Sequence, residues 1–156
     1  MSRIGFGFDT HKLEVGADLF LGGILIPSEK GSVGHSDADV LIHAICDALL
    51  GAANLGDIGT HFPDTDPQFK GIDSKKLLKK VVALLNEKDY RISNIDTTIC
   101  IEKPKIAPHM EHIRQKLAEV IGIPEFDISI KAKTSEKLGF IGREEGISAY
   151  AVVLID

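Results

Sequence analysis

The sequence has no apolar run that approaches the roughly 20 residues of a membrane-spanning helix, and its first residues lack the basic and apolar regions of a secretory signal peptide. We therefore expect a cytosolic (cytoplasmic) protein with no membrane partner. A basic excess is also missing, because the formal net charge is -5. Sequence-independent binding to nucleic acid needs a basic surface that displaces counterions, so nucleic acid is excluded as a partner of that kind.

Cysteine is scarce: Cys46 and Cys100 are the only two, and each lies among apolar neighbours. Neither belongs to a close pair of Cys or His residues, so the pattern predicts buried free thiols and no cysteine-ligated zinc. Internal repeats and linker-like stretches are lacking as well. With 156 residues, the chain is expected to form a single domain, residues 1–156, with a core of its own.

What is present is a series of short apolar-alternating segments, which predict strands, and amphipathic segments, which predict helices. Two apolar arms around Gly22-Gly23 predict a hairpin over residues 19–27. The other expected strands cover residues 3–8, 91–102, 128–134 and 146–155, and the expected helices start near residues 36, 73 and 109. This order predicts an α+β fold with α/β-type layers: a mixed four-stranded sheet with helices on one face, plus the N-terminal hairpin.

The last strand, residues 146–155, is apolar on both of its faces. A strand of this kind is covered on both sides. One layer of helices covers only one face of the sheet, so we expect the second face to pack against further copies of the chain in a symmetric oligomer.

Three potential metal ligands lie on two of the expected elements. Asp9 and His11 follow the first strand two residues apart, which places both side chains on one face. Ser36 and Asp39 fit a capping box that starts a helix at Ser36, and His43 follows Asp39 by one turn. A carboxylate and two imidazoles suit zinc and leave a fourth position open. The alternative for the second group is an ordinary helix start with a surface histidine.

Three loops carry further polar groups. Residues 51–71, rich in Gly, Pro and Asp, are long for a passive connection and fit either a binding loop or a surface excursion. Two prolines keep residues 103–108 extended, where backbone amides can contact a ligand edge. Thr134-Ser135-Glu136 at the end of a strand could serve phosphate and a hard divalent cation, or form a plain turn.

Seven segments together resemble the 2-C-methyl-D-erythritol 2,4-cyclodiphosphate synthase family, in the order of that family and along the whole chain. They are Arg3-Ile4-Gly5 through Gly7-Phe8-Asp9-Thr10-His11, Leu21-Gly22-Gly23, His35-Ser36-Asp37-Ala38-Asp39, Asp47-Ala48-Leu49-Leu50-Gly51, Gly56-Asp57-Ile58-Gly59, Phe62-Pro63-Asp64-Thr65-Asp66 and Glu136-Lys137-Leu138-Gly139-Phe140. No single segment is as specific as the set.

The resemblance implies a metal-dependent phosphorus-oxygen lyase of the non-mevalonate isoprenoid pathway. Its cytidine diphosphate-linked substrate, 4-diphosphocytidyl-2-C-methyl-D-erythritol 2-phosphate, would be cyclised with release of CMP. By similarity, Asp9, His11 and His43 would hold Zn²⁺, and Glu136 would hold a second divalent cation, Mg²⁺ or Mn²⁺. The implied assembly is a homotrimer with its sites at the subunit interfaces.

The resemblance also assigns individual roles. His35 and Thr134 match the positions that stabilise the transition state. Substrate contacts are implied for Asp9, His11, Ser36, Asp57, Ile58, Gly59, Phe62, Asp64, Asp66, Pro104, Lys105, Ile106, Ala107, Lys133, Ser135, Glu136, Phe140 and Arg143. Two other functions remain open from the residues alone: a zinc-stabilised trimeric binding module without turnover, and a zinc hydrolase that cleaves a nucleoside diphosphate with water.

Overall fold

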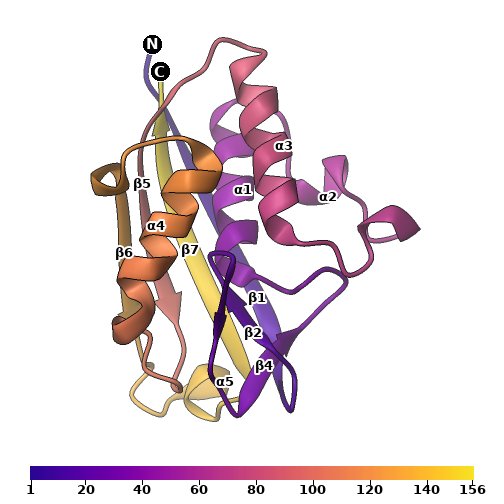
Figure 1. Ribbon diagram of the computed structural model, residues 1–156, viewed down its shortest axis with the longest axis vertical. Coiled ribbons are helices and arrows are strands. Elements are labelled where there is room, and N and C mark those ends of the chain that lie inside the picture. Colours follow the sequence, from indigo (N-terminus) through magenta and orange to yellow (C-terminus); the bar gives the residue numbers. More distant parts are fainter.

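A computed structural model describes residues 1–156, and it contains a five-stranded mixed sheet with strand order β4-β1-β7-β5-β6 (Figure 1). The strands are β1 (Arg3–Val15), β4 (Lys30–Val33), β5 (Ile92–Cys100), β6 (Ile128–Lys133) and β7 (Gly146–Ile155). Helices α1 (Val40–Ala52), α3 (Ser74–Asn86) and α4 (Met110–Ile121) form one layer against the sheet. β5 and β6 are parallel, and the other neighbours are antiparallel. The expected α+β fold with helices on a mixed sheet is confirmed.

The prediction of four strands in this sheet is wrong, because residues 30–33 form a fifth strand, β4, at its edge. β4 pairs with the second half of β1, from Lys12 opposite Val33 to Val15 opposite Lys30. Its sequence, Lys-Gly-Ser-Val, shows no apolar alternation. Backbone pairing joins this segment to the sheet, and hydrophobic periodicity does not detect pairing of that kind.

The predicted hairpin is confirmed as β2 (Leu19–Leu21) and β3 (Ile24–Ile26), which pair antiparallel. The two turn residues, Gly22 and Gly23, have φ values of +60° and +79°, a region that glycine enters without steric cost. Their amide groups donate to the Asp39 carboxylate, at 3.0 Å and 2.7 Å. The hairpin is therefore tied to the start of α1.

The predicted helix start at Ser36 is wrong, because α1 begins at Val40 and Asp39 is its N-cap. The Asp39 side chain accepts from the amide of Ile42 at 3.0 Å, in addition to the two glycine amides. Burial raises the pKa of this carboxyl group, while the amide hydrogen bonds oppose that rise. Because Asp39 is fully buried by these contacts, it cannot reach back to cap Ser36, and residues 36–39 remain outside the helix.

Helix α1 lies closer to β1 than ordinary side chains would permit. A Cβ atom at Gly5 would be 1.8 Å from the Ala48 carbonyl oxygen, and one at Gly7 would be 2.0 Å from that of Ala44. Within α1, only His43, Asp47 and Gly51 are not buried. The helix is thus covered nearly all round, and its His43 side chain meets Asp9 in the middle of β1.

The outer face of the sheet exposes a row of large apolar side chains in the single chain. It consists of Ile4, Phe6 and Phe8 of β1 with Tyr150 and Val152 of β7, and we call it the outer apolar face. Tyr150 stacks on both phenylalanines, with ring centroids 6.5 Å and 5.7 Å apart. An exposed patch of this kind is typical of a protein interface. The alternating inner residues of β7 are buried, as predicted.

Two smaller expectations can be compared with the structure. The thiols of Cys46 and Cys100 are free, as predicted. Cys46 is fully buried, but Cys100 is only partly buried, so the prediction of burial is wrong for Cys100. None of the helices combines the length and the apolar character that crossing a membrane requires.

Candidate active site

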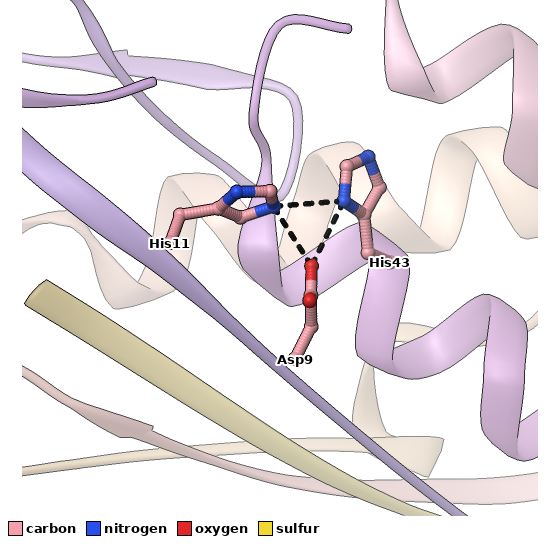
Figure 2. A group of neighbouring side chains, drawn as sticks. All are labelled: Asp9, His11 and His43. Carbon is pink, nitrogen blue, oxygen red and sulfur yellow. Dashed lines mark hydrogen bonds and ion pairs between the residues drawn. The ribbon is translucent and has the colours of Figure 1, made fainter. Parts of the chain in front are cut away.

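Asp9, His11 and His43 converge on one point, as the spacing of these residues predicted (Figure 2). Asp9 and His11 project from the same face of β1, and His43 projects from α1 toward them. His11 Nε2 lies 2.8 Å from Asp9 Oδ2, His43 Nδ1 lies 3.0 Å from the same oxygen, and the two ring nitrogens are 3.1 Å apart. We call this group the triad.

The donor set of the triad fits a zinc ion. One carboxylate oxygen and two imidazole nitrogens lie within 4.8 Å of one another, and all three side chains are only partly buried. Three protein ligands with an open fourth position are typical of catalytic zinc, whereas structural zinc is fully enclosed. The triad therefore has the composition of a catalytic metal centre.

The electrostatics of the triad favour binding of a cation. Burial alone raises the pKa of Asp9, but hydrogen bonds and charge from His11 and His43 outweigh burial and hold it well below its usual range. Burial alone lowers the pKa of His43, but the Asp9 carboxylate raises it above its usual value. The carboxylate thus stays ionised and attracts positive charge, which either a proton on the imidazole or a metal ion supplies.

The triad forms part of the wall of a cavity of about 460 Å³, which we call the metal cavity. Nine predicted site residues line it: Asp9, His11, His35, Ser36, His43, Ile58, Gly59, Phe62 and Asp64. The remaining lining residues are Asp47, Pro63, Thr65, Phe69, Ile72 and Leu77. The structure therefore brings the first strand, the first helix and the 51–71 loop to one place.

The 51–71 loop forms part of the wall of this cavity, which favours a binding loop over a surface excursion. It contains α2 (Ile58–His61) and a short 3₁₀ turn, and the rings of Phe62 and Phe69 meet edge to face at 5.5 Å. The Asp47 carboxylate anchors α2 by accepting from the Ile58 amide at 2.8 Å. Burial raises the pKa of Asp47.

Two predicted site residues of this loop act as caps and do not line the cavity. Asp57 caps α2 by accepting from the Thr60 amide and hydroxyl, both at 2.8 Å, and these hydrogen bonds lower its pKa. Asp66 caps the 3₁₀ turn by accepting from the Gln68 amide at 3.0 Å. Each of them therefore stabilises the backbone conformation of the loop.

A second, smaller cavity of about 180 Å³, which we call the turn cavity, lies between the end of β5, the 103–107 turn, the start of α4 and the end of β6. Six predicted site residues line it: Pro104, Lys105, Ile106, Ala107, Lys133 and Thr134. It shares no residue with the metal cavity. In the sheet, β7 separates β1, which carries Asp9 and His11, from β5 and β6.

The remaining predicted site residues lie outside both cavities. Glu136 is exposed on the turn after β6, where the Glu102 carboxylate accepts from the amides of Ser135 at 3.2 Å and Lys137 at 3.1 Å. The roles implied for Ser135 and Glu136 stay predictions, because the single chain does not bring them to the triad.

The same holds for two residues on and just after the short helix α5 (Gly139–Gly142). Phe140 lies against Gly146, and Arg143 forms an ion pair with Glu145, with Nε 2.7 Å from Oε1. Neither side chain lines one of the two cavities.

Three polar residues of the site were not among the predicted ones: Asp47, Ser74 and Glu102. Asp47 follows His43 by one helical turn, so the i, i+4 spacing could have identified it. Ser74 lies 3.0 Å from His43 Nε2, and Glu102 anchors the 135–137 turn. Sequence spacing gives no signal for the last two, because both act across a tertiary contact.

Comparison with known proteins agrees with this arrangement. A profile of the YgbB family matches residues 2–156. The 2-C-methyl-D-erythritol 2,4-cyclodiphosphate synthase of Bacteroides fragilis is 65% identical over 154 residues, which cover 99% of this chain and 97% of that protein.

Solved structures match equally well. A 2C-methyl-D-erythritol-2,4-cyclodiphosphate synthase with CDP bound superposes with a TM-score of 0.92 at 40% identity, covering 99% of this chain and 100% of the other. The bifunctional IspDF of Campylobacter jejuni superposes with a TM-score of 0.96 at 40% identity, and this chain spans 42% of its length. From the family profile, these similarities and the converging triad, we conclude that the chain belongs to the YgbB family.

Proposed function

We propose that this chain converts 4-diphosphocytidyl-2-C-methyl-D-erythritol 2-phosphate to 2-C-methyl-D-erythritol 2,4-cyclodiphosphate and CMP, in non-mevalonate isoprenoid precursor synthesis. The observation that carries the proposal is the Asp9–His11–His43 triad in the wall of the metal cavity. The 65% identity to a synthase that bears the name of this product supports the substrate assignment.

The reaction places modest demands on the protein. An oxygen of the 2-phosphate attacks the β-phosphorus of the same molecule, and the bond from that phosphorus to the bridging oxygen breaks, so that CMP leaves. The attacking phosphate is already ionised, which removes the need for a strong general base. Catalysis then depends on folding the substrate so that its ends meet, on neutralising phosphate charge and on excluding water.

In the metal cavity, Asp9, His11 and His43 would hold Zn²⁺, which supplies Lewis-acid polarisation of a phosphoryl oxygen when it is bound. His35 and Ser36 lie beside the triad in the cavity wall and are placed to contact the phosphates. Ile58, Gly59 and the neighbouring Asp57 would contact the ribose. Phe62, Asp64 and Asp66 belong to the loop that would cover the methylerythritol end.

The turn cavity would receive the cytosine. Part of its lining is the 104–107 turn, whose backbone amide and carbonyl groups can hydrogen-bond a base edge. Thr134 and Lys133 would face the phosphates from this side, with Ser135 beside them, and Glu136 would hold the second divalent cation, Mg²⁺ or Mn²⁺. The CDP complex of a structurally similar synthase supports a cytidine diphosphate-linked ligand.

The two cavities would meet between subunits of a homotrimer. In one chain the two cavities share no residue and are carried by strands on different sides of β7, which fits a site that combines one cavity from each of two subunits. The outer apolar face offers the surface for such an assembly. Phe140 and Arg143 follow the 134–137 turn in the sequence and would lie near the trimer axis and the ligand.

Phosphorus NMR of the reaction mixture tests the function against both alternatives. The purified chain is incubated with the proposed substrate, zinc and magnesium, and the phosphorus signals are followed with time. A cyclic diphosphate with one equivalent of CMP is the expected result. Linear phosphates would show a hydrolase instead, and unchanged substrate would show a binding module.

A further inference from the structure

Ser74 occupies a position that neither the cavity lining nor the proposed chemistry explains. It is the first residue of α3, is fully buried, and has its hydroxyl oxygen 3.0 Å from His43 Nε2, on the side of the ring away from the triad. The Ser74 hydroxyl donates to Asp37 Oδ1, and the Ser74 amide donates to Asp37 Oδ2 at 2.9 Å. Ser74 thus links a triad histidine to a carboxylate that lies outside the triad.

The direction of these hydrogen bonds follows from the chemistry of the groups. An ionised carboxylate only accepts, so the Ser74 hydroxyl proton points to Asp37. The serine oxygen therefore offers a lone pair to His43, and Nε2 must carry the proton. Ser36 Oγ, 3.1 Å from Nε2, accepts on the same side of the ring. Nδ1 faces Asp9 and His11, 3.0 Å from the Asp9 carboxylate and 3.1 Å from His11 Nε2. When a metal ion displaces the proton that Nδ1 donates to Asp9, Nδ1 is the nitrogen that gives its lone pair to the metal.

We propose that Ser74 and Asp37 are positioning residues, which hold His43 as the Nε2-protonated tautomer and keep Nδ1 aimed at the metal position. The inference rests on the proposed function only for the presence of zinc at the triad. Hydrogen-bond partners of metal-bound histidines typically affect metal affinity by about 10- to 100-fold.

Asp37 has a second connection that a purely local role would not need. Its amide donates to the Ile72 carbonyl at 3.2 Å, and the Gly71 amide donates to the His35 carbonyl at 2.8 Å. These bonds attach the segment that carries His35 and Ser36 to the start of α3. Ser74 and Asp37 therefore orient His43 at the same place where the segment with His35 and Ser36 is attached to the start of α3.

The test is zinc affinity, measured by chelator competition on the metal-stripped full chain, with the absorption spectrum of the cobalt-loaded protein as a second readout. Ser74→Ala is expected to weaken zinc binding by about 10-fold or more and to alter the cobalt spectrum. Ser74→Thr keeps a hydroxyl and is expected to restore most of the affinity. Thr97→Val is the matched control, because it removes another buried hydroxyl bond, to the Ser129 carbonyl, far from the triad.

Asp37→Asn is the second variant, in case the threonine does not fit. Asp37 uses one oxygen for the Ser74 hydroxyl and the other for the Ser74 amide, and asparagine replaces one of these oxygens by an NH₂ group that only donates, so zinc affinity is expected to fall here too. Unchanged affinity in Ser74→Ala would overturn the proposal, as would an equal loss in Thr97→Val. If the wild type makes no cyclic product, the proposed function fails, and the affinity series still decides the role of Ser74.

Discussion

The metal cavity and the turn cavity use the chain in opposite ways. The metal cavity is lined by ionisable side chains from β1, α1 and the loops around α2, so its chemistry depends on residue identity. The turn cavity is lined by the 104–107 turn, which includes the exposed Lys105 and Ala107, and by residues at the ends of β5 and β6 and at the start of α4. The 104–107 turn can offer its backbone groups to a ligand. The comparison indicates that substitutions should be costly in the metal cavity and largely tolerated in the 104–107 turn of the turn cavity.

The two regions also differ in how they are supported. The triad is held from behind by contacts between distant segments, such as His43 with Ser74, and by the close approach of α1 to Gly5 and Gly7. The 134–137 turn, which follows β6 beside the turn cavity, is held by one carboxylate, that of Glu102. The contacts behind the triad are spread over several segments, whereas one substitution, at Glu102, removes the carboxylate that holds the 134–137 turn.

The largest effect is expected from His43→Ala. The variant should lose zinc at the triad and about a thousandfold or more in activity, because several kcal/mol of charge stabilisation go with the metal ion. It should remain folded and keep the proposed trimeric assembly, since the outer apolar face is untouched. Metal content, cyclic product formation and light scattering measure these points. His112→Ala, an exposed histidine on α4, is the control and should keep both zinc and activity. Full activity in His43→Ala would contradict the ligand assignment.

Mixing two inactive variants tests whether the two cavities cooperate between subunits. His43→Ala damages the metal cavity, and Thr134→Val damages the turn cavity. If each site combines one cavity from each of two subunits, co-expressed random trimers regain about a quarter of the wild-type sites. If both cavities of one subunit served the same site, no subunit in the mixture would be intact. Cyclic product formed by the mixed trimers, against that of each variant alone, distinguishes these arrangements.

The difference between the regions also explains what the sequence could predict. The two-residue period placed Asp9 and His11 on one face, and the short stretch from Ser36 to His43 kept the second histidine near a helix start, so the triad was predictable. The helix start itself was wrong, because Asp39 is used by Gly22 and Gly23 of the hairpin. A carboxylate that accepts from a distant segment has the same sequence pattern as one that caps its own helix only.

Strand β4 and the residues behind the triad were missed for a related reason. β4 has no apolar alternation, and Ser74 is 31 positions from His43. Pairing of backbones and contacts between distant polar groups leave no periodic pattern. One chain does not define where Glu136 and Phe140 lie relative to a ligand, because the proposed site combines two subunits.

A moderate effect is expected from Glu102→Gln. One carboxylate oxygen accepts from the Ser135 amide and the other from the Lys137 amide, and glutamine replaces one of these oxygens by an NH₂ group that only donates. An unsatisfied amide costs about 1–3 kcal/mol, so we expect the 134–137 turn to shift and kcat/KM to fall by about tenfold. Zinc affinity should stay at the wild-type value, because the metal cavity does not include this turn. A parallel loss of zinc would show that the two regions are coupled within one chain.

The smallest effect is expected from Lys105→Ala, and it tests whether the turn cavity reads its ligand by backbone. Removing the side chain leaves the amide and carbonyl groups of the turn in place, so only the attraction of one exposed positive charge for an anionic ligand is lost. Such attraction is screened by salt. Calorimetric titration with CDP should therefore show affinity lowered by about twofold at low ionic strength, and the difference should vanish at high ionic strength. A tenfold loss that persists in high salt would instead mean that the lysine contacts the ligand directly, and the turn cavity would then depend on residue identity as much as the metal cavity does.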